Sequence, residues 1–293
     1  MQETNLATPA DTRKIDWPVM LFIIGVHIAA IPALFYFSWE GVLTMLLLNF
    51  LTGCIGVTFG MHRLFSHRTF KVVKPVEWIA GLCASLSFQG TIADWVAHHR
   101  MHHAGSDTDE DPHNANEGFF YCHVGWLFYK NPKFDDPQKL KAFARDIYRD
   151  PVLTFMSSKA FMIGAQIALA AILYALGGIG LVFWGIFARI VFTYHSTWLV
   201  NSACHAWGYR NFEVGDRATN NWIVAFLAWG EGWHNNHHAY GDSVKSGFRF
   251  WEIDVTYIII RMLKALGLAY DLKYTMPGQG KVAPAESVPA AGK

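Results

Sequence analysis

The chain has 293 residues, of which 52% are hydrophobic, 15% aromatic and only 16% charged. A soluble domain usually carries about 25% charged residues, and the mean hydropathy of +0.18 also favours a membrane protein. The net charge of +1 gives no basic excess, and no basic stripe with interleaved aromatic residues is present, so we expect no nucleic-acid partner. The four cysteines form no C-x-x-C pair, which indicates buried free thiols rather than disulfides or metal ligands.

Four apolar runs follow a polar leader at residues 1–15. They cover about residues 17–37, 41–60, 154–176 and 179–200, and about 20 helical residues are enough to cross a bilayer. Only short turns separate the first run from the second and the third from the fourth. We therefore predict an all-α membrane protein with four transmembrane helices arranged as two hairpins.

The basic residues indicate the orientation of these spans. The turns at 38–40 and 177–180 carry no Lys or Arg, and nearly all Lys and Arg lie before the first run, between the second and third, or after the fourth. The positive-inside rule puts those regions, and both termini, in the cytoplasm. Arg189 is the exception inside the fourth run, and we expect it to face the interior of the bundle rather than lipid.

Three further segments are not predicted to span the membrane. Residues 76–93 are apolar but short and interrupted by Glu77 and Gln89, so we expect them to lie in the interface or to fold back against the bundle. Residues 250–269 mix apolar and basic side chains, which is typical of an amphipathic interfacial helix. The end of the chain, 277–293, is rich in Pro, Ala and Gly and is predicted to be disordered.

Eight of the 14 histidines fall into three clusters, each at the predicted cytoplasmic end of a span or beyond it. An H-x-x-H-H pattern occurs twice, and on a helix its three imidazoles share one face. Buried imidazoles repel one another when protonated and need partners when neutral, and a metal ion meets both needs. The clusters are His62 and His67; His99, His102 and His103; and His234, His237 and His238.

With His205 as a ninth member, the set exceeds what one metal needs, since zinc usually takes four ligands. Nine imidazoles suit two metals, and the absence of carboxylates from the clusters disfavours Mg, Ca and Mn. Iron binds imidazole and also activates oxygen. A long acyl or alkyl chain could reach such a centre from the membrane side. The sequence therefore predicts a cytoplasmic, His-rich helical cap that holds a dimetal site.

At this point the chain resembles the membrane fatty-acid desaturases, and specifically the Δ9 acyl desaturase group that includes stearoyl-CoA desaturases and the bacterial and cyanobacterial enzymes. The matching segments run through most of the chain in the family's order. They are GMHRLFSHR (60–68), DWVAHHRMHH (94–103), DPHN (111–114), HVGW (123–126), NSACH (201–205) and GEGWHNNHH (230–238).

The resemblance implies a single desaturase domain over 16–276 and a multi-pass protein of a bacterial inner membrane. It implies two iron ions held by nine histidines, with Asn201 approaching one metal through water. It also implies that Gln89, Trp95 and Thr197 line the bend of an acyl tunnel. The nine implied ligands are His62, His67, His99, His102, His103, His205, His234, His237 and His238.

The implied reaction is the O2-dependent removal of two hydrogens across C9–C10 of a saturated acyl chain, giving a cis double bond. Animal acyl-CoA members carry a basic and an acidic residue where this chain has Ala97 and His98. The carrier is therefore left open among CoA, acyl carrier protein and a lipid. No cytochrome b5 module with its His-Pro-Gly-Gly sequence is fused to the chain, so the expected electron donor is separate: a ferredoxin, a cytochrome b5 or a rubredoxin-like protein.

Other classes stay open at this stage. A membrane di-iron hydroxylase would use the same scaffold, although the N-S-x-x-H element favours desaturation. A zinc hydrolase would need a general base such as the Glu of H-E-x-x-H, and that motif is missing. A metal-binding or transport protein without catalysis would place histidines repetitively along its spans, whereas here they gather at span ends.

Overall fold

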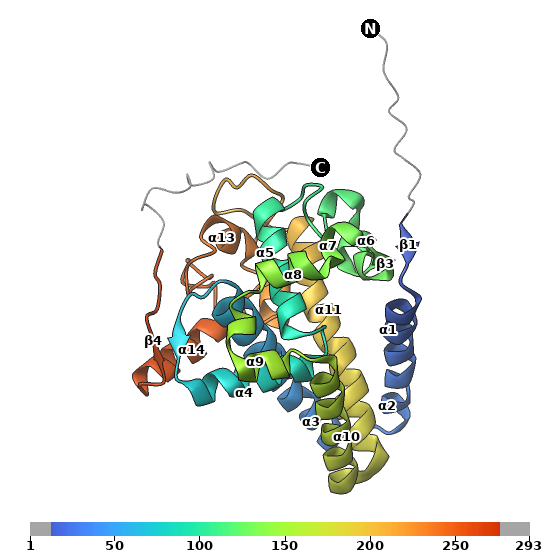
Figure 1. Cartoon of the computed structure of the whole chain (residues 1–293). Coiled ribbons are helices and arrows are strands. Elements are labelled where there is room, and N and C mark those ends of the chain that lie inside the picture. The colour runs from blue at the N-terminus through green and yellow to red at the C-terminus, as the bar shows by residue number, and fades with distance from the viewer. Residues whose placement is uncertain (1–12, 276–293) are drawn as a thin grey trace, which may run out of the picture.

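The computed structural model describes residues 13–275, and almost all of its regular structure is helical (Figure 1). The predicted leader at 1–15 lies mostly outside the described residues, and the tail at 277–293 lies wholly outside them. The first part of the chain forms α1 (Trp17–Ala30), α2 (Pro32–Phe35), α3 (Trp39–Asn49) and the π-helix η1 (Phe50–Ser66).

The remaining helices lie partly in the polar regions and partly in the apolar runs. They are α4 (Lys74–Ser87), α5 (Ile92–Gly105), η2 (Ala115–Glu117), α6 (Phe119–His123), η3 (Gly125–Phe128), α7 (Pro132–Asp135), α8 (Pro137–Phe143), η4 (Ile147–Arg149), α9 (Pro151–Met156), α10 (Lys159–Val182), η5 (Phe183–Ala188), α11 (Arg189–Ser202), η6 (Ala203–His205), α12 (Trp222–Leu227), α13 (His234–Ala239) and α14 (Val255–Ala265).

Two short antiparallel pairs fasten distant segments together. The strand β1 (Lys14–Ile15) pairs with β3 (Tyr129–Lys130), which ties the start of α1 to the polar region. The strand β2 (Lys71–Val72) pairs with β4 (Ala269–Tyr270), which ties the segment after η1 to the segment after α14.

Three helical stretches of the described chain are long and apolar enough to cross a membrane: Trp17–Phe35, Trp39–Ser66 and Lys159–His205. The third has 47 residues and contains most of the third predicted run and all of the fourth. Its backbone leaves helical geometry at Gly177 and Gly178, where Gly178 has a φ of +71°, a left-handed conformation that glycine adopts without strain. Figure 1 shows the chain running down α10 and returning along α11 beyond this break.

Two predicted boundaries differ from the structure. The third run was expected to begin near 154, but residues up to Met156 form the separate helix α9, and α10 begins at Lys159 because the Ser158 hydroxyl accepts the Phe161 amide at 3.1 Å. The second run was expected to end before His62. Instead η1 continues to Ser66. The backbone amide of His67 donates to the His62 carbonyl at 3.0 Å, and this i→i+5 bond extends the π-helix.

The segment predicted not to span packs against the bundle. Most of it forms α4, and Gly56 of η1 lies so close that an added Cβ would be 2.5 Å from the Cys83 carbonyl carbon. The chain leaves α4 at Phe88, whose φ is +62°. The predicted inward position of Arg189 is confirmed, because the side chain is fully buried and donates to Thr52, Gln166 and two backbone carbonyls.

Gly56→Ala should lower the thermal unfolding midpoint of the detergent-purified protein. The added methyl group cannot be accommodated without moving α4 away from η1, and overpacking of this kind costs about 1–3 kcal/mol. Gly25→Ala is the matched control, because nothing lies within 4 Å of its added Cβ. Equal midpoints for the two variants would show that the two helices do not pack as closely as described.

Candidate metal centre

The helix α5 carries the first H-x-x-H-H segment. The Thr91 hydroxyl accepts the Asp94 amide at 3.1 Å and caps the start of the helix, which satisfies an amide that has no partner within the helix. As the spacing predicts, His99, His102 and His103 lie on one side of α5, within the last two turns. The second such segment forms α13, a single short helix from His234 to Ala239.

The nine predicted ligands converge in two adjoining groups. Each H-x-x-H-H segment contributes to both groups, so neither segment builds a group alone. Within a group, one side-chain nitrogen of each member lies within 4.8 Å of those of the others. The first group is His62, His67, His99, His103 and His237, and the second is His102, His205, His234 and His238.

The first group points its Nε2 atoms at a common space. His67 and His99 bring theirs to 2.8 Å, and His237 lies 3.0 Å from both His62 and His103. These rings come from η1, the segment that follows it, α5 and α13. Five imidazole nitrogens gathered within 4.8 Å of one another are a ligand set for Zn, Cu, Fe or Ni.

The second group repeats this arrangement beside the first. The Nε2 atoms of His234 and His205 are 3.0 Å apart, and those of His102 and His238 are 3.3 Å apart. The ring of His238 also lies 4.7 Å from that of His103, which belongs to the first group. The two groups therefore adjoin and form one continuous centre.

Four of the nine histidines turn their Nδ1 atom toward a carboxylate. Such a partner fixes the tautomer and the ring orientation of a ligating histidine and raises its basicity. Sequence reasoning missed all four carboxylates. The pairs are His62 with Glu231 at 2.7 Å, His102 with Asp111 at 2.8 Å, His205 with Asp107 at 2.9 Å, and His238 with Asp216 at 2.6 Å.

Burial keeps most of the centre neutral. It lowers the pKa of His67, His99 and His103 well below the ordinary histidine value, and the neighbouring imidazoles lower it further. The same causes lower the pKa of His234 and His237. These five rings are uncharged at neutral pH, so each keeps a lone pair for a metal.

His102 differs because of its carboxylate. Burial lowers its pKa, but Asp111, together with Asp107 and Asp216, more than offsets this and the net pKa is raised. Asp111 also accepts the Asp107 and His113 amides at 2.9 and 3.0 Å. The pKa of the Asp111 carboxyl is lowered despite its burial, because His113, His102 and these amides favour the charged form. Asp111 is therefore an anion that orients His102.

Comparison with known proteins agrees with this centre. The fatty acid desaturase family model matches residues 37–273. The chain belongs to the fatty acid desaturase family. It is an acyl desaturase, an oxidoreductase of lipid metabolism.

Cyanobacterial relatives match the desaturase over most of its length. One from Anabaena variabilis, named sn-1 stearoyl-lipid 9-desaturase, is 47% identical over 89% of this chain and 94% of its own. Another of the same name, from Synechocystis sp., is 46% identical over 88% of this chain and 80% of its own. A sn-2 palmitoyl-lipid 9-desaturase from Nostoc sp. is 42% identical over 91% of this chain and 93% of its own.

The three residues expected at the tunnel bend contact one another in the desaturase. The Trp95 indole donates to the Gln89 side-chain oxygen at 3.3 Å, and the Gln89 amide donates to the Thr197 hydroxyl at 2.9 Å. The Trp95 ring also stacks on His99 with 5.0 Å between centroids. These side chains therefore form a connected wall that reaches the first histidine group. Asn201 lies one helical turn before His205, and its role through water stays a prediction.

A tenth histidine borders the centre. The ring of His113 stacks on His102 with 4.3 Å between centroids, and His113, His102 and Asp111 form a third group with metal-binding spacing. Burial lowers the pKa of His113 to about 3. The D-P-H-N segment was noted for its resemblance, but its position beside His102 depends on the loop after α5, which spacing alone does not predict.

Three other histidines of the desaturase lie in a separate hydrogen-bonded series. His27 Nδ1 lies 2.7 Å from the Ile23 carbonyl, so it must donate, and its Nε2 lies 3.1 Å from His195 Nε2. His195 Nδ1 lies 3.0 Å from His123 Nε2, and His123 Nδ1 lies 2.9 Å from the Ser202 hydroxyl. Both nitrogens of His195 therefore face a neighbouring histidine, and the three rings link α1, α11 and α6 in series.

Asp111→Asn should reduce the metal content of the purified desaturase and its affinity for added metal by about 10–100-fold, the usual effect of losing a partner that orients a ligand. The amide keeps the size of the side chain but removes its charge. Metal content is measured by elemental mass spectrometry and affinity by titration of the stripped protein.

Asp135→Asn is the matched control, because Asp135 lies 3.6 Å from His98, which belongs to neither group. Metal binding of Asp111→Asn equal to that of this control would exclude the proposed orienting role.

Proposed function

We propose that this desaturase introduces a cis double bond at Δ9 of a saturated acyl chain carried on a membrane lipid. The observation that carries the proposal is the convergence of nine histidines beside the Trp95–Gln89–Thr197 wall. The names of the cyanobacterial relatives support both the Δ9 position and a lipid carrier. Ala97 and His98 also favour a lipid carrier, because the charged pair of animal acyl-CoA enzymes is replaced there.

In this proposal the nine histidines hold two iron ions, and Asn201 approaches one of them through water. The donor set fits iron because it consists of imidazoles whose Nδ1 atoms in part face carboxylates. When bound, the ions supply the oxidising chemistry with O2 as co-substrate. Overall, one CH2–CH2 unit, O2, two electrons and two protons become one cis CH=CH unit and two water molecules.

The chain's own residues orient the substrate. The hydrogen bonds at the proposed bend run in one direction: Trp95 donates to Gln89, Gln89 to Thr197, and the Thr197 hydroxyl to the Thr193 carbonyl at 3.0 Å. Each of these donors has an acceptor, so the wall is rigid without a ligand. A rigid bend presents one pair of carbons to the centre and favours the conformation that gives a cis product.

The proposed topology has four membrane crossings in two hairpins, with the third and fourth meeting at the break at Gly177 and Gly178. The histidine cap and both termini then face the cytoplasm of a bacterial cell, as the distribution of basic residues supports. Residues 16–276 act as one domain. A separate ferredoxin, cytochrome b5 or rubredoxin-like protein delivers the electrons.

Expression in aerobic cells that lack their own Δ9 desaturase tests the reaction. We expect new cis-Δ9 monoenes by gas chromatography and mass spectrometry, with double bonds located after derivatisation, and the newly formed chains in glycerolipids. His103→Ala should abolish the product while the protein still inserts in the membrane, because it removes one of the five nitrogens of the first group.

Hydroxy acids in place of monoenes would make the protein a hydroxylase. If no product forms, isolated membranes receive labelled acyl lipids and each candidate electron donor. No turnover with any donor would contradict the proposed reaction, and equal product from His103→Ala would contradict the metal assignment.

Thr197→Leu should reduce the yield and change the ratio of C16 to C18 products by about tenfold, because leucine adds bulk at the bend and removes the acceptor of the Gln89 amide. The product profile of whole cells measures this change. Ser196→Ala, the neighbouring position on α11, is the control, since the Ser196 hydroxyl bonds only its own helix at Phe192. A profile unchanged by Thr197→Leu would remove Thr197 from the tunnel.

A further inference from the structure

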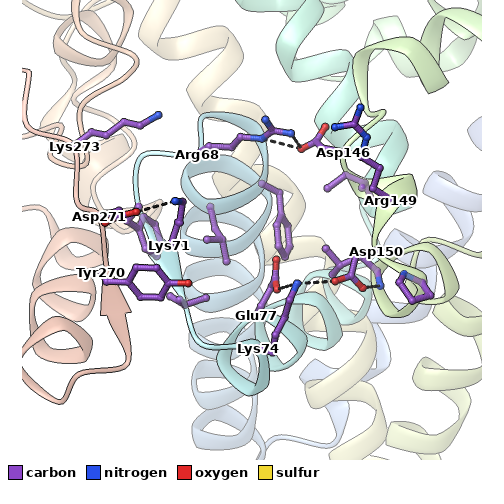
Figure 2. A pocket seen from close by; sticks show the side chains of 17 residues that line it. Arg68, Lys71, Lys74, Glu77, Asp146, Arg149, Asp150, Tyr270, Asp271 and Lys273 are labelled. Atoms are coloured by element: carbon purple, nitrogen blue, oxygen red, sulfur yellow. Dashed lines mark hydrogen bonds and ion pairs between the residues drawn. The ribbon is translucent and has the colours of Figure 1, made fainter.

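A hollow of about 760 Å³ opens on the face of the molecule between the end of η1 and the η4–α9 segment (Figure 2). It is separate from the histidine centre. Its floor is apolar and includes Phe65, Phe70 and Leu153, which are all buried. Its rim is charged and comes from the η1 end, β2, the first turn of α4, the η4–α9 segment and the residues from β4 onward. An apolar floor with a charged rim fits an amphiphilic molecule.

The hollow lies at the level where two candidate spans end. The stretch Trp39–Ser66 ends in its floor, and the α9 residues that line it come just before the stretch that starts at Lys159. The adjoining helix α4 exposes Trp78, Ile79 and Leu82, side chains that suit contact with lipid, and tryptophan is enriched at membrane interfaces. With the membrane crossings proposed above, the hollow lies on the side of the lipid head groups and adjoins an apolar face that suits contact with lipid.

The charges of the rim do not cancel. Each acidic side chain of the rim already has a cationic partner: Arg68 with Asp146, Lys71 with Asp271, and Lys74 with both Glu77 and Asp150.

Two cations remain at the rim, Arg149 and Lys273. Neither side chain has an ion pair or hydrogen bond among residues 13–275, and both are exposed. Figure 2 shows them on opposite sides of the hollow. Because Lys74 serves two acids, the five cations and four acids of the rim leave one excess positive charge, and the two unpaired cations flank an apolar floor. This arrangement favours an anionic ligand.

We propose that this hollow binds the phosphate head group of an anionic phospholipid, with Arg149 and Lys273 attracting the anion from the two sides of the rim and the acyl chains lying along the exposed face of α4. Basic pockets beside membrane spans on the cytoplasmic side bind anionic lipids by this chemistry. The chain's own tail is a poor occupant, because residues 276–293 carry Lys281 and Lys293 against the single acid Glu286. The proposal rests on the membrane crossings proposed above and is independent of the reaction.

The experiment measures binding of short-chain phosphatidylglycerol and phosphatidylcholine to the purified full chain in neutral detergent, by native mass spectrometry and by titration. We expect phosphatidylglycerol to bind about tenfold more tightly, and Arg149→Gln with Lys273→Gln to remove that preference. The control is Arg261→Gln with Lys264→Gln on α14, which makes the same change in charge at exposed positions outside the hollow and should keep the preference.

Inorganic phosphate serves as the competitor that separates a lipid site from a site for free phosphate. Millimolar phosphate should not displace the lipid, because it cannot use the apolar floor. Equal binding of the two lipids by the unmodified protein, equal loss in both double variants, or displacement by phosphate would each overturn the proposal. None of these readouts uses turnover, so they remain decisive even if the proposed reaction fails.

Discussion

The structure depends on holding nine imidazoles in one water-poor space with most of them uncharged. Each ring needs its inward nitrogen free, and its outward nitrogen must be satisfied or tolerate burial. The carboxylates do this for part of the set and hold their own negative charge while doing so. Glu231 shows the extent of the support: it contacts His62 and also the buried Arg63, which in turn contacts Asp254 at the start of α14. One ligand is thus tied to the packing of a helix far along the chain.

Helical periodicity explains how so few segments build two groups. Residues three and four apart lie on one face but not on one line, so the rings of a single H-x-x-H-H segment diverge. On α5, His99 and His103 turn to the first group and His102 to the second; on α13, His237 joins the first and the other two join the second. The two segments therefore interlock, and displacing either helix would open both groups. This also makes the centre a contact that joins the two halves of the chain.

Much of this was predictable because the signals are local. The histidine spacing, the apolar runs and the inward Arg189 follow from periods and lengths. The carboxylates did not follow, since Asp216 and Glu231 pair with histidines more than 20 and more than 160 residues away. Arg63 was counted only as a cytoplasmic charge, whereas it is 1% exposed in the core, because its partners become visible only once η1 and α14 are packed together. Helix ends were missed where a single hydroxyl or an i→i+5 bond decides the boundary.

Along the last part of the apolar stretch Lys159–His205, polar side chains connect the histidine centre to the apolar interior. Residues four apart on α11 and η6 form one stripe, and each step rises about 6 Å along a helix. The stripe consists of Arg189, Thr193, Thr197, Asn201 and His205. At one end Arg189 is buried among neutral acceptors, and at the other His205 belongs to the second histidine group. Between them, the Thr193 hydroxyl shares its one hydrogen between the Asn49 side-chain oxygen and the Arg189 carbonyl of its own helix. A buried cation in a membrane stretch is costly unless its hydrogen bonds are satisfied. The bonds that satisfy Arg189 also hold α11 at its membrane end, and the same helical stretch carries His205 at its other end. Thr197, at the proposed bend, lies between these two fixed points, a position where a substrate chain could be held still without any loop closing over it.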